Sequence, residues 1–223
     1  MSFPPCGIIL VNKPKGMTSH DVVDFARNRL GIRKIGHAGT LDPMATGLLI
    51  LLVGKATKLS SRFAELDKEY EATLHLGVRT DTGDAEGKII EERPVAVSEK
   101  EIYEAFSRFI GEIEQVPPMI SAIRYKGRRL YELARKGITI PRSPRKVKIY
   151  RLEVNHIDLP EVSFTVACSK GTYIRKLCED IGELLGCGAY QSRLHRLRIG
   201  SFSVKEAIEL EELNEDSIRQ IYL

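Results

Sequence analysis

The sequence has no tryptophan, only four cysteines, and no apolar run near the roughly 20 residues that a membrane-spanning helix requires. The cysteines form no C-x-x-C pair, and no histidine pair lies near them at metal-ligand spacing, which argues against a zinc site and against a disulfide framework. The N-terminus lacks the basic region and following apolar region of a signal peptide. We therefore expect a cytoplasmic protein with reduced, mostly buried cysteines, no membrane partner and no bound metal.

The charge of the chain is concentrated in one block. The 223 residues suffice for one large domain, residues 1–223, and 29% charged with 43% hydrophobic residues is ordinary for a globular protein. Residues 121–151 hold eleven Lys or Arg and one acid, Glu132, so this block carries +10 whereas the whole chain carries +4. Such a basic block is typical of a surface that binds a phosphate backbone, although a solvated loop without a partner has the same composition. Further basic residues follow, including Arg193, Arg196 and Arg198.

One segment combines a candidate catalytic carboxylate with a core strand. Residues 36–47 are rich in turn formers and contain Asp42, and residues 48–53 read L-L-I-L-L-V, which predicts a strand buried on both faces. Pro43 restricts the residue before it to extended geometry, so Asp42 is expected on a stiff loop anchored by a buried strand. This placement suits a nucleophile or general base. An Asx turn, in which Asp42 bonds only its own backbone, is the alternative.

Hydrophobic periodicity predicts alternating strands and helices along the rest of the chain. Strands are expected at residues 7–11, 69–77, 146–156, 162–169 and 194–199, and helices from Thr18 to Gly31, from Ser98 to Gly111, and over 171–186. The 69–77 strand carries Tyr70 on its apolar face and is expected to form a hairpin with K-I-I-E-E-R-P. The T-D-T-G-D-A-E-G loop between them has some features of a calcium loop but lacks its distal Glu.

Tyr173 and Arg175 lie where a strand is followed by a helix, a position that often carries functional groups. A residue at the rim of the core and a surface charge are the alternative interpretations of these two side chains.

Several motifs, in order along nearly the whole chain, resemble those of the TruB family of tRNA pseudouridine synthases. H-A-G-T-L-D-P-M-A-T-G-L-L resembles the catalytic motif of this family. The others are V-N-K-P-K-G-M-T-S, K-E-Y-E-A-T-L-H-L-G-V-R-T-D-T-G-D, Q-V-P-P-M-I-S-A and C-S-K-G-T-Y-I-R.

The resemblance implies an enzyme that isomerises uridine to pseudouridine at position 55, in the T loop of tRNA. Asp42 matches the catalytic aspartate of the family, Tyr70 the tyrosine that stacks on the target base, and Arg175 the arginine that pairs with the catalytic carboxylate. Other positions that match residues near the substrate are Tyr173, Leu194, His37 and Lys13. No cofactor is implied, because the pyrimidine itself takes up the electrons.

The resemblance also implies an α+β fold, with a mixed and mostly antiparallel central sheet flanked by helices. The block at 121–151 would act as a thumb-like segment that grips the T arm of tRNA, and we expect a monomer. Family members often carry a C-terminal RNA-binding domain of the PUA type, and the sequence, which ends at Leu223, leaves no room for one.

Three other functions stay open. A tRNA-binding or tRNA-folding module could keep the fold without catalysis, and a related synthase could act on another RNA. A different enzyme with an aspartate nucleophile is the third. Aspartyl-phosphate phosphatases require a second Asp two residues on, where this chain has Met44, and glycosidases require paired carboxylates, of which residues 36–57 offer only Asp42.

Overall fold

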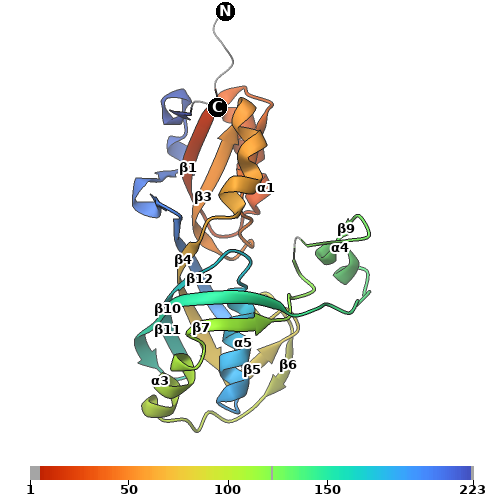
Figure 1. The fold of residues 1–223 in the computed structure, drawn as a ribbon, viewed down its shortest axis with the longest axis vertical. Coiled ribbons are helices and arrows are strands. Elements are labelled where there is room, and N and C mark those ends of the chain that lie inside the picture. Colours follow the sequence, from red (N-terminus) through yellow and green to blue (C-terminus); the bar gives the residue numbers. More distant parts are fainter. Residues whose placement is uncertain (1–5, 122, 222–223) are drawn as a thin grey trace, which may run out of the picture. The chain divides into compact units, whose positions relative to one another are not determined.

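The computed structural model describes residues 6–121 and 123–221 (Figure 1). Residues 1–5, on which the interpretation of the N-terminus rests, lie outside them. The chain forms two compact units: the first combines Met1–Glu71 with Leu194–Leu223, and the second is Ala72–Arg193. Two strands, β4 (Lys68–Leu76) and β12 (Ala189–Ile199), run from one unit into the other. Among the described residues, no helix combines the length and apolar character needed to cross a membrane.

The sheet of the first unit is centred on β3 (Thr46–Val53). Along one edge it pairs antiparallel with β1 (Gly7–Lys13), from Gly7 opposite Val53 to Lys13 opposite Gly47. It also pairs antiparallel with β2 (Ile35–Ala38) near its end and parallel with β12 at its start. Shorter strands complete the unit: β13 (Phe202–Ser203) beside β12, and β14 (Ile208–Glu209) and β15 (Arg219–Gln220) beside β1.

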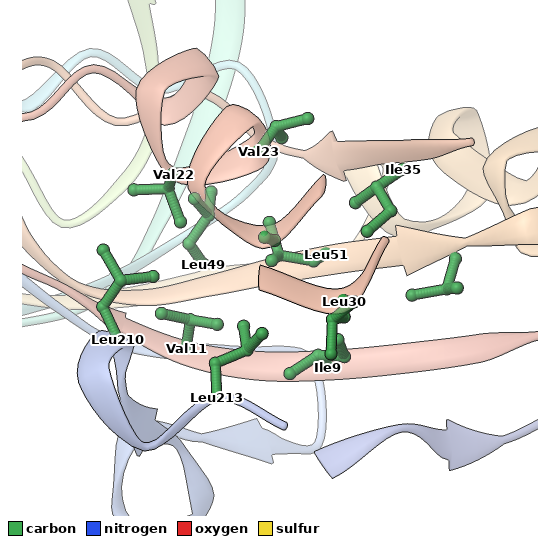
Figure 2. Close-up of a cluster of buried hydrophobic side chains, with 12 residues drawn as sticks. Ile9, Val11, Val22, Val23, Leu30, Ile35, Leu49, Leu51, Leu210 and Leu213 are labelled. Atoms are coloured by element: carbon green, nitrogen blue, oxygen red, sulfur yellow. The ribbon is translucent and has the colours of Figure 1, made fainter. Parts of the chain in front are cut away.

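Both faces of β3 are buried, as its unbroken apolar sequence predicts. On one face Leu49 and Leu51 pack with the inner side of helix α1 (Ser19–Leu30) and with Leu210 and Leu213 (Figure 2). On the other face, alternate residues of β1 and β3 pack with Ala56 and Ile199. Ala56 lies in the 3-10 turn η1 (Gly54–Leu59), which leads into α2 (Ser60–Ala64). Each fully buried Leu, Ile or Val contributes roughly 1.5–3 kcal/mol to stability.

Helix α1 has the predicted ends. Thr18 accepts a hydrogen bond from the Asp21 backbone N–H, and the Asp21 carboxylate accepts one in return from the Thr18 N–H. This capping box satisfies two donors that the first turn would otherwise leave unpaired. At the other end Gly31 adopts a left-handed conformation, with φ of 66°.

The second unit contains a mostly antiparallel sheet and two covering helices. In this sheet β4 is followed by β11 (Glu161–Cys168), β10 (Arg145–Asp158) and β7 (Gly111–Gln115). Helix α3 (Glu99–Ser107) packs Phe106 against Phe164 of β11, with ring centroids 5.3 Å apart. Helix α5 (Ile174–Leu184) buries Ile174, Leu177, Cys178 and Ile181. The predicted α+β fold with a mostly antiparallel sheet is confirmed.

Two predicted connections differ in the structure. K-I-I-E-E-R-P forms β6 (Ile89–Glu92), but its partner is β5 (Val78–Thr80) rather than the 69–77 strand, so the hairpin is a separate two-stranded sheet. Gly111 does not end helix α3, which stops at Ser107; it begins β7, with φ of +108°. A glycine with positive φ serves either role, and the pairing of β7 with β10 decides between them.

The basic block adopts several short elements before it joins the sheet (Figure 1). A hairpin of β8 (Arg124–Tyr125) and β9 (Arg128–Arg129) leads into helix α4 (Leu130–Ala134). Leu130 and Leu133 of this helix are buried, and the block ends within β10. Lys126, Arg135 and Lys148 each lie over a tyrosine ring, with the cation about 5.5 Å from the ring centroid.

Gly47 is required by the contact between β3 and β12. Its φ is +99°, and a Cβ built there would lie 2.4 Å from the Arg196 carbonyl oxygen. Gly16 has a similar φ of +90°, but a Cβ there would meet nothing within 4 Å.

We expect Gly47→Ala to lower the melting temperature far more than Gly16→Ala. Both substitutions force alanine into the left-handed region, at a cost of about 1–2 kcal/mol. Only Gly47→Ala adds a steric clash with backbone. Thermal unfolding of the native chain and both variants measures the difference, and equal losses would show that the β3–β12 contact tolerates a side chain.

Candidate active site

The loop that carries Asp42 is anchored on both sides of this residue. Ser19 of helix α1 exchanges two hydrogen bonds with Leu41: the Leu41 N–H donates to Ser19 Oγ at 2.8 Å, and Ser19 Oγ donates to the Leu41 carbonyl at 3.1 Å. The Pro43 carbonyl accepts from the Gly16 N–H at 2.8 Å and from Lys13 Nζ at 3.2 Å. Asp42 is half-buried between these two fixed residues, which holds its backbone in one position.

Lys13 is wholly buried and serves this loop. Besides the Pro43 carbonyl, its ammonium donates to the carbonyls of Pro14 at 2.8 Å and Met17 at 2.6 Å. The resemblance implied a position near the substrate for Lys13. Its side chain has no exposed surface, so the ammonium is bound by these carbonyls and not by solvent.

Arg196 of β12 is the central cation of this unit, with only 1% of its surface exposed. Its Nε donates to the Leu48 carbonyl at 2.7 Å, and its two Nη atoms donate to the carbonyls of Gly39, at 3.0 Å, and Thr40, at 3.5 Å. These carbonyls lie before and after Asp42 along the chain. The guanidinium therefore ties the two ends of the loop together.

The same guanidinium interacts electrostatically with Tyr70 and with Asp42. Burial lowers the pKa of Arg196 below its ordinary value, and the neighbouring Tyr70 and Asp42 oppose that effect. An arginine keeps its charge in proteins even when buried, so Asp42 and the Tyr70 hydroxyl share one cationic neighbour. Tyr70 is itself buried, with 8% of its surface exposed.

Arg196 is not among the site residues predicted from the sequence, where it is only one of several basic residues. The residues around it, H-R-L-R-I, alternate basic and apolar side chains, and this alternation does not separate a buried arginine from an exposed one. Arg198, two residues further on, is exposed. The other two predicted residues of this unit, His37 on β2 and Leu194 on β12, are half-buried.

The second unit holds Arg175 and Tyr173 in fixed positions. Arg175 is buried and forms an ion pair with Asp84 at 3.4 Å, with 5% of each side chain exposed. Its Nη atoms also donate to the carbonyls of Thr82, at 3.2 Å, and Ile120, at 2.7 Å. The interpretation of Arg175 as a surface charge is therefore wrong. The predicted partnership of Arg175 with Asp42 links residues of the two units and stays a prediction.

Asp84 belongs to the loop that the sequence analysis compared with a calcium loop. Its carboxylate accepts hydrogen bonds from Thr82 Oγ1 at 2.6 Å and from the Glu86 N–H at 3.1 Å, in addition to pairing with Arg175. The loop thus presents Asp84 inwards, to an arginine.

Tyr173 occupies the N-cap position of helix α5 and is half-buried. Its backbone N–H donates to Gln115 Oε1 at 3.0 Å, and Gln115 Nε2 donates to its carbonyl at 3.3 Å. The end of β7 thereby holds the first turn of the helix in which Arg175 lies.

Comparison with known families identifies the family to which this chain belongs. Residues 27–174 match the N-terminal domain of the TruB family of pseudouridylate synthases, and residues 175–221 match the C-terminal domain of tRNA pseudouridylate synthase B. The chain belongs to the TruB family. It is therefore a pseudouridine synthase, an enzyme of the isomerase class, as the motifs predicted.

Individual relatives agree with this assignment. The chain is 52% identical to tRNA pseudouridine synthase B of Clostridium kluyveri, covering 95% of this chain and 73% of that protein. It is also 52% identical to tRNA pseudouridine synthase B of Alkaliphilus oremlandii, covering 93% of this chain and 69% of that protein.

Two solved structures share the fold. The first, a Cbf5–Nop10–Gar1 complex, gives a TM-score of 0.72 at 34% identity, covering 96% of this chain and 57% of that chain. The second, an H/ACA RNP bound to a substrate RNA containing 2′-deoxyuridine, gives a TM-score of 0.70 at 32% identity, covering 93% and 52%. This chain spans about half the length of those two chains.

Ser19→Ala should reduce pseudouridine formation while the protein stays folded. The change leaves the Leu41 N–H and carbonyl without their partner, which loosens the loop next to Asp42. A displacement of about 1 Å at a reacting group can cost 10²-fold in rate. We expect kcat to fall about 10- to 100-fold, measured with a tRNA transcript. Ser107→Ala, which removes an exposed hydroxyl at the end of α3, is the control, and equal kcat in both variants would contradict the anchoring role.

Asp84→Asn should destabilise the protein by removing the buried negative charge that pairs with Arg175. Removal of one partner from a buried ion pair costs about 3–5 kcal/mol. Urea unfolding of the native chain, Asp84→Asn and Asp81→Asn measures this cost. Asp81 lies in the same loop but is exposed, and its carboxylate accepts a hydrogen bond from the Lys88 N–H at 2.8 Å. Equal midpoints for the two variants would show that the Asp84–Arg175 pair adds no stability.

Proposed function

We propose that this protein isomerises uridine to pseudouridine in the T loop of tRNA, at position 55, with Asp42 as the reacting carboxylate. The relatives at about 50% identity that are named tRNA pseudouridine synthase B support tRNA as the substrate. The observation that carries the role of Asp42 is its anchoring: hydrogen bonds fix the residues on both sides of it, and a buried guanidinium lies beside it.

The reaction breaks one bond of the nucleotide and forms another. The bond from N1 of the uracil to C1′ of the ribose is broken, the base rotates, and C5 is joined to C1′. The hydrogen on C5 is lost and a proton is gained at N1, so the product is an isomer of the substrate. Asp42 either attacks as a nucleophile or removes a proton on the way to a glycal-like intermediate. Both routes require an ionised carboxylate, which a neighbouring cation favours.

The target base must leave the helical stack before a side chain can reach it, and an extruded base needs apolar and aromatic walls. Tyr70 supplies the aromatic face in this proposal, and Tyr173 and Leu194 supply further walls. Tyr70 is buried, which leaves its ring little freedom to turn. His37 and Lys13 complete the set: His37 on the RNA side and Lys13 as the support of the Asp42 loop.

The basic block at 121–151 is proposed to grip the T arm through its phosphates. Arg175 donates to the carbonyl of Ile120, directly before the block begins. The pyrimidine takes up the electrons itself, so the reaction needs neither a cofactor nor a metal. We propose that the enzyme acts as a monomer, in the cytoplasm, where tRNA is processed.

Mass-resolved mapping of pseudouridine in a T-arm transcript tests the proposal. We expect product at position 55 with the native protein and with Asp81→Asn, and none with Asp42→Asn, because an amide is neither a base nor a nucleophile. Product from Asp42→Asn would remove the role assigned to this residue.

The same experiment separates the alternatives. A tRNA-folding module would give no product with any variant, while both native protein and Asp42→Asn would restore the fold of a misfolded tRNA. The 32% identity to a protein in an RNP bound to another substrate RNA favours a second candidate, a synthase acting on a different RNA. Product from structured non-tRNA transcripts, with none from the T arm, would support that candidate.

A further inference from the structure

We propose that Arg196 is a positioning residue, which arranges Asp42 for the reaction by binding carbonyls on both sides of the Asp42 loop with one buried guanidinium. The inference rests on the proposed function of Asp42. It adds Arg196, a residue of the first unit that acts through the Asp42 loop and does not itself touch the substrate.

Arg196 is buried, with 1% of its surface exposed. Moving a charge out of water costs several kcal/mol unless hydrogen bonds and an opposite charge compensate for it. Three carbonyls, of Gly39, Thr40 and Leu48, supply hydrogen bonds but no net charge. Asp42 interacts electrostatically with this guanidinium and contributes negative charge near it. A structural arginine on an exposed strand face would need no such arrangement.

The backbone of Arg196 is packed closely against the start of β3. Arg196 pairs with Gly47 in the parallel ladder between β12 and β3, and the two backbones approach so closely that only glycine fits at position 47. The guanidinium then binds the carbonyls on both sides of the Asp42 loop, which precedes Gly47. Arg196 therefore constrains the Asp42 loop both through its main chain and through its side chain.

The charge of the guanidinium adds to this positioning. Arg196 interacts electrostatically with Asp42. A nearby cation favours the ionised form of a carboxyl, which both routes of the proposed reaction require.

Single-turnover kinetics with Arg196→Met, Arg196→Lys and Arg198→Met test the proposal. We expect Arg196→Met to lower the rate constant for pseudouridine formation about 100-fold, equivalent to about 2.7 kcal/mol at 1.36 kcal/mol per factor of ten. The Kd for the T-arm transcript should change less than about threefold. Arg198→Met makes the same chemical change two residues further along β12, at an exposed position, and should leave the rate constant unchanged.

The pH dependence of this rate constant distinguishes positioning from general structural support. Loss of a cation raises the pKa of a nearby carboxyl, so the acidic limb of the profile should move up by about 1 pH unit in Arg196→Met. Arg196→Lys keeps the charge but loses the fork of donors, and should keep the native limb with a reduced rate constant. Lys13, which donates to the Pro43 carbonyl, and His195, whose Nδ1 lies 2.8 Å from Thr46 Oγ1, also contact this region and are unchanged in these variants.

The outcomes are distinguishable. A native rate constant in Arg196→Met, or a reduced one with an unmoved acidic limb, would overturn the proposal. Failure of the proposed function would appear separately, as absence of product from the native protein. If Arg196→Met does not fold, the Arg196→Lys variant provides the test, because it loses the fork of donors to the Gly39, Thr40 and Leu48 carbonyls. A native rate constant in Arg196→Lys would then overturn the proposal.

Discussion

The site depends on the complete burial of β3. This strand has no polar face, so α1 and the C-terminal segments must cover one side, and η1 with neighbouring apolar residues the other. Its edges are constrained as well. β1 follows one edge, while β12 pairs at the start of β3 and β2 at its end. The loop at 39–45, which connects β2 to β3, therefore emerges beside β12, and this places Asp42 next to Arg196.

Two buried cations, Lys13 and Arg196, hold the Asp42 loop together with the buried apolar residues Leu41, Met44 and Ala45. Each is almost entirely without exposed surface, and each donates to carbonyls of the Asp42 loop or its flanks. Hydrogen bonds to a charged donor are stronger than neutral ones, particularly where water is excluded. The arrangement has a second effect, because positive charge beneath the loop favours an ionised carboxylate on it.

Features set by neighbouring residues were predictable from the sequence. Capping boxes at Thr18 and Ser98 begin helices in the structure, and L-L-I-L-L-V is a strand buried on both faces. Features set by the choice of strand partners were not. The partner of β6 is the nearby β5 and not the 69–77 strand, and Gly111 begins a strand that pairs with β10 instead of ending a helix.

The sequence by itself determined which chemistry this protein carries: its ordered motifs identify a pseudouridine synthase family, and they place Asp42 on a stiff loop before a core strand. Only the tertiary structure decided which cations serve that loop. Arg196 and Arg198 differ by two positions on one strand, and their local sequences give no reason to separate them. Burial separates them, because the packing of β12 against β3 encloses one guanidinium among loop carbonyls and leaves the other in water.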